Sequence, residues 1–153
     1  MSRNYYSELH LHMVWHTKLS QPLLAPQVEA VVHQCIRQKI INTAGAFVHE
    51  IGGTENHVHV AVTIAPTITI SEFIGQLKGA SSHDANQKLG SGRKLLEWQT
   101  GYGVVSFGTK DLEWVQAYVR NQKQHHAKGE VFDRLERITP DEKEAEAEQQ
   151  EAP

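Results

Sequence analysis

With 153 residues, of which 39% are hydrophobic and 22% charged, the chain is expected to form one domain around a buried core. Its single cysteine, Cys35, excludes an intrachain disulfide, and no apolar run of about 18 residues suggests a membrane span, so we expect a cytoplasmic protein. The formal net charge of -3 does not exclude a nucleic-acid partner, because the acidic residues are concentrated near the C-terminus.

The first predicted element is a strand between Tyr5 and Trp15. Apolar residues alternate along it with a period of two, which is the pattern of a strand buried on one face. These apolar positions are Leu9, Leu11, Met13 and Trp15. A helix of about four turns is predicted next, from Val28 to Ile40, because apolar side chains recur there at helical spacing and Gly45 follows.

A β-hairpin is predicted in the middle of the chain. Residues 46–51 and 57–64 both have strand character, and the intervening Gly52-Gly53-Thr54-Glu55 has the composition of a turn. A second helix is predicted from Ile70 toward Gly90, after Pro66 has ended the second strand of the hairpin.

The last predicted elements are a strand over residues 102–107 and a helix over residues 111–126. From Asp141 the chain reads DEKEAEAEQQEAP, which holds six of the eighteen acids and one of the fifteen bases. We therefore expect one domain over residues 1–138 and an acidic, disordered tail over residues 139–153, because the tail lacks large apolar side chains. Without the stretch from Asp141, 14 bases and 12 acids remain, which is compatible with a nucleic-acid partner.

This order of elements predicts an α/β (α+β) fold of the ferredoxin-like type, an antiparallel sheet with two helices on one face plus a C-terminal helix. The alternating residues of the third strand then divide between the two faces, with the valines toward the helices and His57 and His59 on the open face. In this topology the first and third strands are neighbours, so His10 and His12 also emerge there. We interpret His10 and His12 as polar residues of the surface or sheet face and not as ligands, and the alternative is a role in supporting the ligands or in contacting DNA.

The spacing of His57 and His59 does not by itself identify a metal site. The chain contains ten histidines, so on the order of one His-X-His triplet is expected by chance, and His10 and His12 form another. The final helix supplies further candidates, because Tyr118 and Gln122 are four residues apart and share a side of the helix.

The combination of these residues suggests metal-assisted chemistry at a phosphate. Two imidazoles and a carboxamide oxygen leave coordination positions open, which suits a Lewis acid better than a closed structural zinc site. Tyrosine is a weak nucleophile at its ordinary pKa near 10, and a divalent cation beside a positioned phosphate is one way to make it adequate. A half-buried packing tyrosine is the simpler alternative for Tyr118.

Four segments, in this order and spacing, resemble the IS200/IS605-type transposases, the single-tyrosine members of the HUH endonuclease superfamily. They are GGTENHVHVAV, SEFIGQLKGASS, WQTGYGVVSFG and AYVRNQKQHH, and the resemblance extends from about Leu9 to about Phe132. It implies an RRM-like sheet, a divalent ion (Mg2+ or Mn2+) on His57, His59 and Gln122, and attack of Tyr118 on a DNA phosphodiester. The implied product is a 5'-phosphotyrosine link with a free 3'-hydroxyl.

The same resemblance implies that the substrate is single-stranded DNA with subterminal hairpins at the ends of a mobile element. It also implies a homodimer, in which the tyrosine helix of one chain can complete the histidine pair of the other, and the sequence leaves open whether the site forms in cis or in trans. Five basic residues are candidates for phosphate contacts, although a solvated charge is an equal alternative for each. They are Lys18, Lys78, Arg93, Arg120 and Lys123.

Two other functions remain open from the sequence. One is a non-catalytic or domesticated single-stranded nucleic-acid-binding relative that keeps the sheet and the basic groups. The other is a metallohydrolase that uses water at a histidine-rich centre, with Tyr118 outside the reaction. The leading hypothesis is a metal-dependent transposase, a DNA strand transferase and endonuclease with a tyrosine nucleophile.

Overall fold

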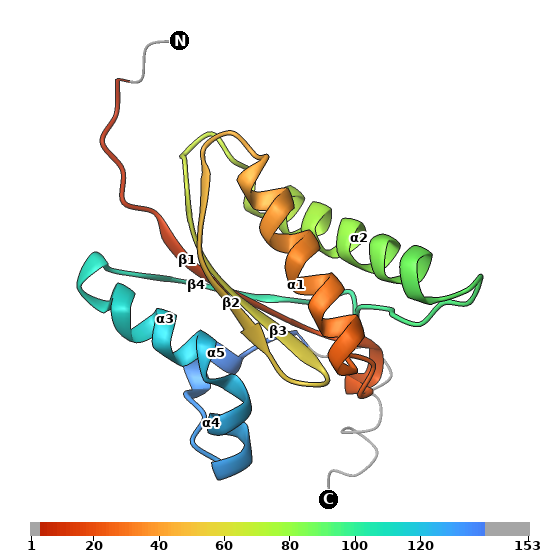
Figure 1. Ribbon diagram of the computed structural model, residues 1–153. Coiled ribbons are helices and arrows are strands. Elements are labelled where there is room, and N and C mark those ends of the chain that lie inside the picture. The colour runs from red at the N-terminus through yellow and green to blue at the C-terminus, as the bar shows by residue number, and fades with distance from the viewer. Residues whose placement is uncertain (1–3, 140–153) are drawn as a thin grey trace, which may run out of the picture.

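A four-stranded antiparallel sheet divides the molecule into two helical layers (Figure 1). The computed structural model describes residues 4–139. The strands follow the spatial order β2-β3-β1-β4, with β1 between β3 and β4. Their bounds are His10–His16 (β1), Ala46–Gly53 (β2), His57–Ile64 (β3) and Gly103–Phe107 (β4). The prediction that the first and third strands are neighbours in the sheet is therefore confirmed.

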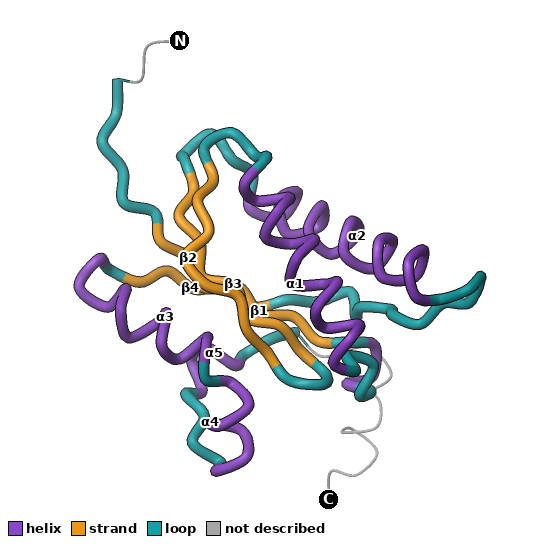
Figure 2. The backbone as a smooth tube through the Cα atoms, viewed as in Figure 1, coloured by secondary structure: helices purple, strands orange, loops and turns teal. Residues whose placement is uncertain are grey.

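Two long helices cover one face of this sheet, and three shorter helices lie on the other (Figure 2). The long pair is α1 (Pro26–Ile41) and α2 (Ile70–Leu89). The shorter set is α3 (Leu112–Arg120), α4 (Gln122–Lys128) and α5 (Asp133–Glu136). Short 3-10 turns, Lys18–Ser20 and Thr109–Asp111, precede α1 and α3. The predicted α/β architecture, with two helices on one face and a C-terminal helical segment carrying Tyr118, is confirmed.

The main core lies between the sheet and the pair α1 and α2. Alternate side chains of β1 and β3 point into it and are buried, as the period-two pattern predicted. Leu9, the first apolar position of that pattern, precedes β1 and is 40% exposed, so its predicted burial is wrong. The sheet contributes Leu11, Met13, Trp15, Val58, Val60 and Val62. Burial of such side chains contributes about 1.5–3 kcal/mol each, so this layer holds the strands, and with them the histidines of the other face, in register.

The structure differs from the predicted element boundaries most at β1, at the Gly52-Gly53 pair and in the final helix. β1 begins at His10 and not at Tyr5: His10 is opposite Phe107, the last residue of β4, and Thr63, the penultimate residue of β3. The Gly52-Gly53 pair lies inside β2, paired with β3, and not in the turn. The predicted final helix is divided at Asn121 into α3 and α4. The predicted tail over residues 139–153 falls almost entirely outside the described residues.

The second face of the sheet is not open, which corrects the prediction for His57 and His59. Val115 and Val119 of α3 pack on Ala61 of β3 and form a second, smaller core. Gly52 makes the close approach possible, because a Cβ atom built there would lie 1.9 Å from the carbonyl oxygen of Val119. The histidines of this face are consequently enclosed between sheet and helices. Among residues 4–139, no helix is both long and apolar enough to span a membrane.

Candidate metal centre and nucleophile

His57 and His59 project from β3 toward the small helices and are almost fully buried. Their exposed fractions are 2% and 0%, and their ring centroids are 4.9 Å apart. Burial lowers the pKa of His57 to about 3 and the pKa of His59 well below its ordinary value. Both imidazoles are therefore neutral near pH 7, which is the form that binds metal ions.

The hydrogen bonds of His57 leave its Nε2 atom available. Nδ1 lies 2.7 Å from Oδ1 of Asn56, an oxygen that can only accept, so Nδ1 carries the proton and donates it. Thr54 Oγ1 lies 2.9 Å from the same nitrogen. The lone pair of Nε2 then points toward α4 and α5, as a metal ligand requires.

His59 is oriented by His12, which lies beside it on β1. Nε2 of His12 is 2.7 Å from Nδ1 of His59, and both rings are completely buried. Nε2 of His59 is buried and forms no hydrogen bond, and its charged neighbour is Oε2 of Glu136 at 3.2 Å. When Nδ1 of His59 donates to His12, Nε2 presents a lone pair to the enclosed space, so this arrangement fits a metal ligand. His12 was predicted as a polar residue of an open sheet face; it lies on that face but is completely buried, and its place outside the ligand set stays a prediction.

Tyr118 lies on α3 with only 4% of its surface exposed. Its hydroxyl donates a 2.6 Å hydrogen bond to Oε1 of Glu136 and accepts one of 2.8 Å from the backbone N–H of Phe132. The ring stacks between Trp114 and His125, with centroid distances of 5.5 and 4.9 Å. Burial, followed by the hydrogen bond to Glu136, raises the pKa of Tyr118 to about 12. The hydroxyl is therefore protonated at neutral pH.

Gln122, the first residue of α4, places its amide oxygen among the histidines. Its Nε2 donates a 3.0 Å hydrogen bond to the carbonyl oxygen of Tyr118, which turns Oε1 toward the centre. Oε1 lies 3.4 Å from Nε2 of His57 and 3.0 Å from Nε2 of His126. The side chain is completely buried. Tyr118 and Gln122 therefore share a side facing β3 despite the break of the helix at Asn121.

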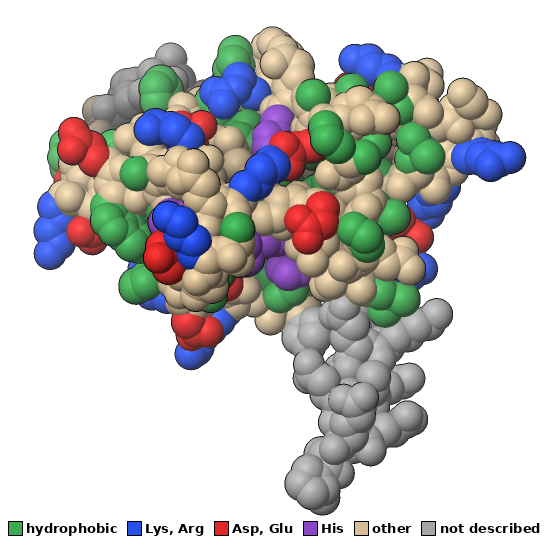
Figure 3. All heavy atoms as spheres, turned by 60° about the horizontal axis from the view of Figure 1, so that its bottom comes forward, with side chains coloured by type: hydrophobic (Ala, Val, Ile, Leu, Met, Phe, Trp, Pro, Cys, Tyr) green, Lys and Arg blue, Asp and Glu red, His purple; other side chains and the backbone are tan. Residues whose placement is uncertain are grey.

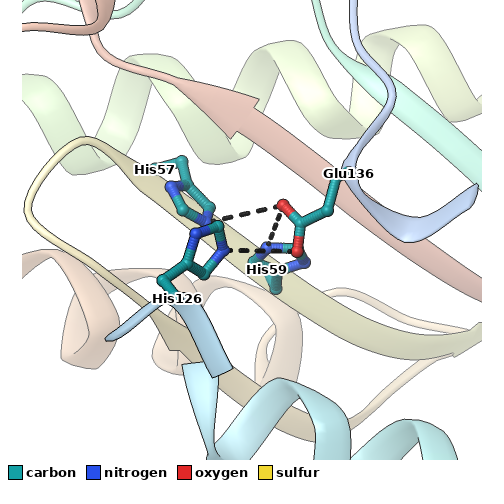
Figure 4. Close-up of side chains that lie close together, drawn as sticks. All are labelled: His57, His59, His126 and Glu136. Carbon is teal, nitrogen blue, oxygen red and sulfur yellow. Dashed lines mark ion pairs between the residues drawn. The ribbon is translucent and has the colours of Figure 1, made fainter. Parts of the chain in front are cut away.

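Two further residues complete the centre, and neither was singled out as a site residue from the sequence. His126 of α4 and Glu136 of α5 converge with His57 and His59, and one potential ligand atom from each of the four lies within 4.8 Å of the others (Figure 4). Oε2 of Glu136 is 3.2 Å from Nε2 of His59 and 3.7 Å from Nε2 of His57. No motif marks Glu136, because only tertiary packing brings α5 to this face.

Two of the five candidate DNA contacts, Lys18 and Lys78, are engaged with other groups, and a third, Arg93, is exposed. Lys18 forms an ion pair with Glu97 at 3.4 Å. The ammonium group of Lys78 donates to the backbone carbonyls of residues 99, 100 and 101, which fixes the segment before β4. Arg93 is exposed in the loop that follows α2. None of these three is brought to the metal centre.

Arg120 and Lys123 lie closer to the centre, on either side of the break between α3 and α4. Arg120 forms an ion pair with Glu50 at 3.1 Å, and Lys123 forms one with Glu29 at 2.6 Å. Both cations remain more than 60% exposed. Figure 3 shows Lys, Arg, Asp and Glu side chains interspersed over one face, with histidines visible between them. A role in phosphate contact remains a prediction for all five residues.

Comparison of the sequence with known protein families identifies the family of this chain. Residues 5–122 match the family model described as "Transposase IS200 like", which covers more than half of the chain. The chain belongs to the IS200-like transposase family. This transposase is 24% identical over 127 residues to the ISDra2 transposase TnpA of Deinococcus radiodurans, covering 78% of its own length and 88% of that relative. It is 32% identical over 79 residues to the transposase for insertion sequence element IS200 of Salmonella typhimurium, covering 49% and 51%.

Solved structures confirm the fold of this transposase. A crystal structure of a candidate transposase from Deinococcus radiodurans R1 matches with a TM-score of 0.62 and 23% identity, over 80% of this chain and 96% of the other. A REP-associated tyrosine transposase bound to a REP hairpin matches with a TM-score of 0.56 and 18% identity, over 86% and 75%. The function predicted from the sequence, a transposase enzyme, is thereby confirmed at the level of the family.

Proposed function

We propose that this transposase cleaves and rejoins single-stranded DNA through a covalent link to Tyr118, at a centre in which His57, His59 and Gln122 hold a divalent ion, Mg2+ or Mn2+. The observation that carries the proposal is the convergence of Tyr118 with two neutral imidazoles in a buried cluster of side chains. The ring centroids of Tyr118 and His59 are 6.1 Å apart. One phosphate group could reach both.

The residues around the ion site fit such a role on structural grounds. Nε2 of His59 is buried and forms no hydrogen bond, and Nε2 of His57 faces the same space after Nδ1 has donated to Asn56. Gln122 adds a carboxamide oxygen, a ligand type that hard cations accept. A bound divalent ion would polarise a phosphate oxygen and neutralise developing charge.

In the first proposed step, the phenolic oxygen of Tyr118 bonds to phosphorus and the bond from phosphorus to the 3' oxygen breaks. The products are a 5'-phosphotyrosine and a 3'-hydroxyl, which carries the proton that tyrosine loses, so no external nucleotide is consumed. Attack of a second 3'-hydroxyl on the phosphotyrosine reverses the step and joins strands. Because Tyr118 is protonated and buried, its hydroxyl must exchange its bond to Glu136 for contact with the phosphate.

Single-stranded DNA with a hairpin is the proposed substrate, supported by the relative that is described as bound to a REP hairpin. Tyr118 and His59 of the same chain lie with their ring centroids 6.1 Å apart, which supports a site completed in cis. A homodimer with sites shared in trans stays a prediction from the family resemblance.

Adduct formation tests the proposed function directly. The protein is incubated with Mn2+ and single-stranded DNA from the sequence flanking its gene, and the products are separated under denaturing conditions. Wild type should give a denaturant-stable adduct, Tyr118→Phe should give none, and Tyr6→Phe, which changes an exposed tyrosine, should behave as wild type. His57→Ala should also lose the adduct while DNA binding persists. Cleavage by Tyr118→Phe would instead favour a hydrolase that uses water.

A further inference from the structure

Glu136 supplies a negative charge to a centre whose other candidate ligands are neutral. We propose that its carboxylate is a direct ligand of the divalent ion, so that α5 belongs to the metal site. This inference rests on the proposed metal site of His57 and His59 and adds a ligand to it. The match to the family model ends at residue 122, so it assigns no role to a residue this far along the chain.

The two oxygen atoms of Glu136 face different partners. Oε2 lies 3.2 Å from Nε2 of His59 and 3.7 Å from Nε2 of His57 (Figure 4). Oε1 accepts a 2.6 Å hydrogen bond from the hydroxyl of Tyr118. A small shift would let Oε2 and both imidazole nitrogens bind one ion while Oε1 still orients Tyr118. A single carboxylate would thus connect the metal to the nucleophile.

The chain holds Glu136 in this place by several independent contacts. The neighbouring Leu135 is 1% exposed, and the guanidinium of Arg134 donates a 2.6 Å hydrogen bond to the carbonyl oxygen of Ser106 in β4. The next residue, Arg137, brings its carbonyl oxygen so close to Gly103 that a Cβ atom there would be 1.8 Å away. Glu136 itself is only 16% exposed. Such anchoring is unnecessary for a solvated surface acid.

Ligand chemistry supports the carboxylate over the other neighbours. Mg2+ and Mn2+ prefer oxygen ligands, carboxylate above all, and His57, His59 and Gln122 provide only one neutral oxygen. His126 also offers a nitrogen, but its Nε2 lies 3.0 Å from Oε1 of Gln122, where it fits a hydrogen-bond partner of that amide. Glu136 provides the carboxylate in the group of four candidate ligands found among the described residues, and the other three are histidines.

Direct measurement of Mn2+ affinity by electron paramagnetic resonance, without DNA, tests the assignment. Glu136→Gln keeps the size of the side chain and an acceptor for Tyr118 but removes the charge. Because loss of a group that merely supports a ligand weakens metal binding about 10–100-fold, Glu136→Gln should raise the Kd for Mn2+ at least about tenfold. Glu130→Gln, the same change at an exposed position of the preceding loop, is the matched control and should keep the wild-type Kd.

The variants separate this inference from the proposed function. If His57→Ala abolishes Mn2+ binding while Glu136→Gln leaves the Kd unchanged, the metal centre stands and Glu136 is not a ligand. If that unchanged Kd accompanies faster adduct formation, the carboxylate merely occupies the phosphate position. If His57→Ala and Glu136→Gln both bind Mn2+ as wild type does, the proposed metal centre also fails. Should Glu136→Gln prove unfolded by circular dichroism, Glu136→Asp replaces it, and an unchanged Kd there overturns the inference.

Discussion

The hydroxyl of Tyr118 and the carboxylate of Glu136 are joined by a 2.6 Å hydrogen bond that spans 18 residues of sequence and two separate helices. The same hydroxyl accepts the backbone N–H of Phe132, in the loop before α5. The candidate nucleophile thus forms part of the attachment of the C-terminal segment to the body. The hydroxyl proposed to attack DNA therefore also stabilises the packing of the C-terminal segment.

The first prediction concerns the stability cost of removing that hydroxyl. Tyr118→Phe leaves the Phe132 N–H and the partly buried Glu136 carboxylate without this partner, and a buried unpaired polar group costs about 1–3 kcal/mol. The free energy of unfolding in urea should fall by that amount, whereas Tyr6→Phe, at an exposed position, should change little. Unfolding curves of Tyr118→Phe and wild type that coincide would show that the two hydrogen bonds contribute no net stability.

Strand periodicity predicted the framework of the site but not its enclosure. The alternation of residues along β1 and β3 correctly placed His57 and His59 on one face with His10 and His12, away from the main core. Their burial depends on α3 docking through Val115 and Val119, with Gly52 beneath. A single strand pattern does not contain that information.

Glu136 illustrates a second limit of sequence reasoning. It lies on α5, a helix of four residues, and is separated from Gln122 by α4 and a loop. No spacing connects it with the His-X-His pair, so only the tertiary position of α5 reveals it. By contrast, Tyr118 and Gln122 could be paired in advance, because a separation of four residues puts both on one side even across the break at Asn121.

The second prediction concerns pH and stability. Burial lowers the pKa of His12, His57 and His59 in the folded protein, while the unfolded chain should titrate near 6.5. Below pH 6.5 the unfolded state therefore binds more protons, and stability should fall as the pH drops from 6.5 toward 3. Each histidine can contribute up to about 1.4 kcal/mol per pH unit in that window.

Urea unfolding in the presence of EDTA between pH 7 and pH 4.5 measures this dependence for the metal-free protein. The variant His57→Gln has one buried imidazole fewer, so its stability should fall less steeply with decreasing pH than that of wild type. Equal slopes for the two proteins would mean that His57 is not held neutral by burial.

The third prediction assigns His12 a role in orienting His59. His12→Phe keeps a ring in the same space but removes the partner of Nδ1 of His59, so Mn2+ affinity should fall about 10–100-fold. His10→Phe is the matched control, because His10 lies on the same face of β1 but bonds Thr63 and Thr109 instead. The Kd of each variant for Mn2+ is compared with wild type, and equal losses in both would indicate a general effect on the sheet.

The last prediction concerns the packing of the C-terminal segment, residues 133–137, against β4. In Gly103→Ala the new Cβ would lie 1.8 Å from the carbonyl oxygen of Arg137, a distance that forces the segment away from the strand. The segment should then open more often, so trypsin should cut after Arg134 and Arg137 faster than in wild type. In Gly108→Ala nothing lies within 4 Å of the new Cβ, so cleavage should keep the wild-type rate. Because Glu136 lies between the two cleavage sites, Gly103→Ala should also weaken Mn2+ binding. Faster cleavage with unchanged Mn2+ affinity would show that α5 does not belong to the metal centre.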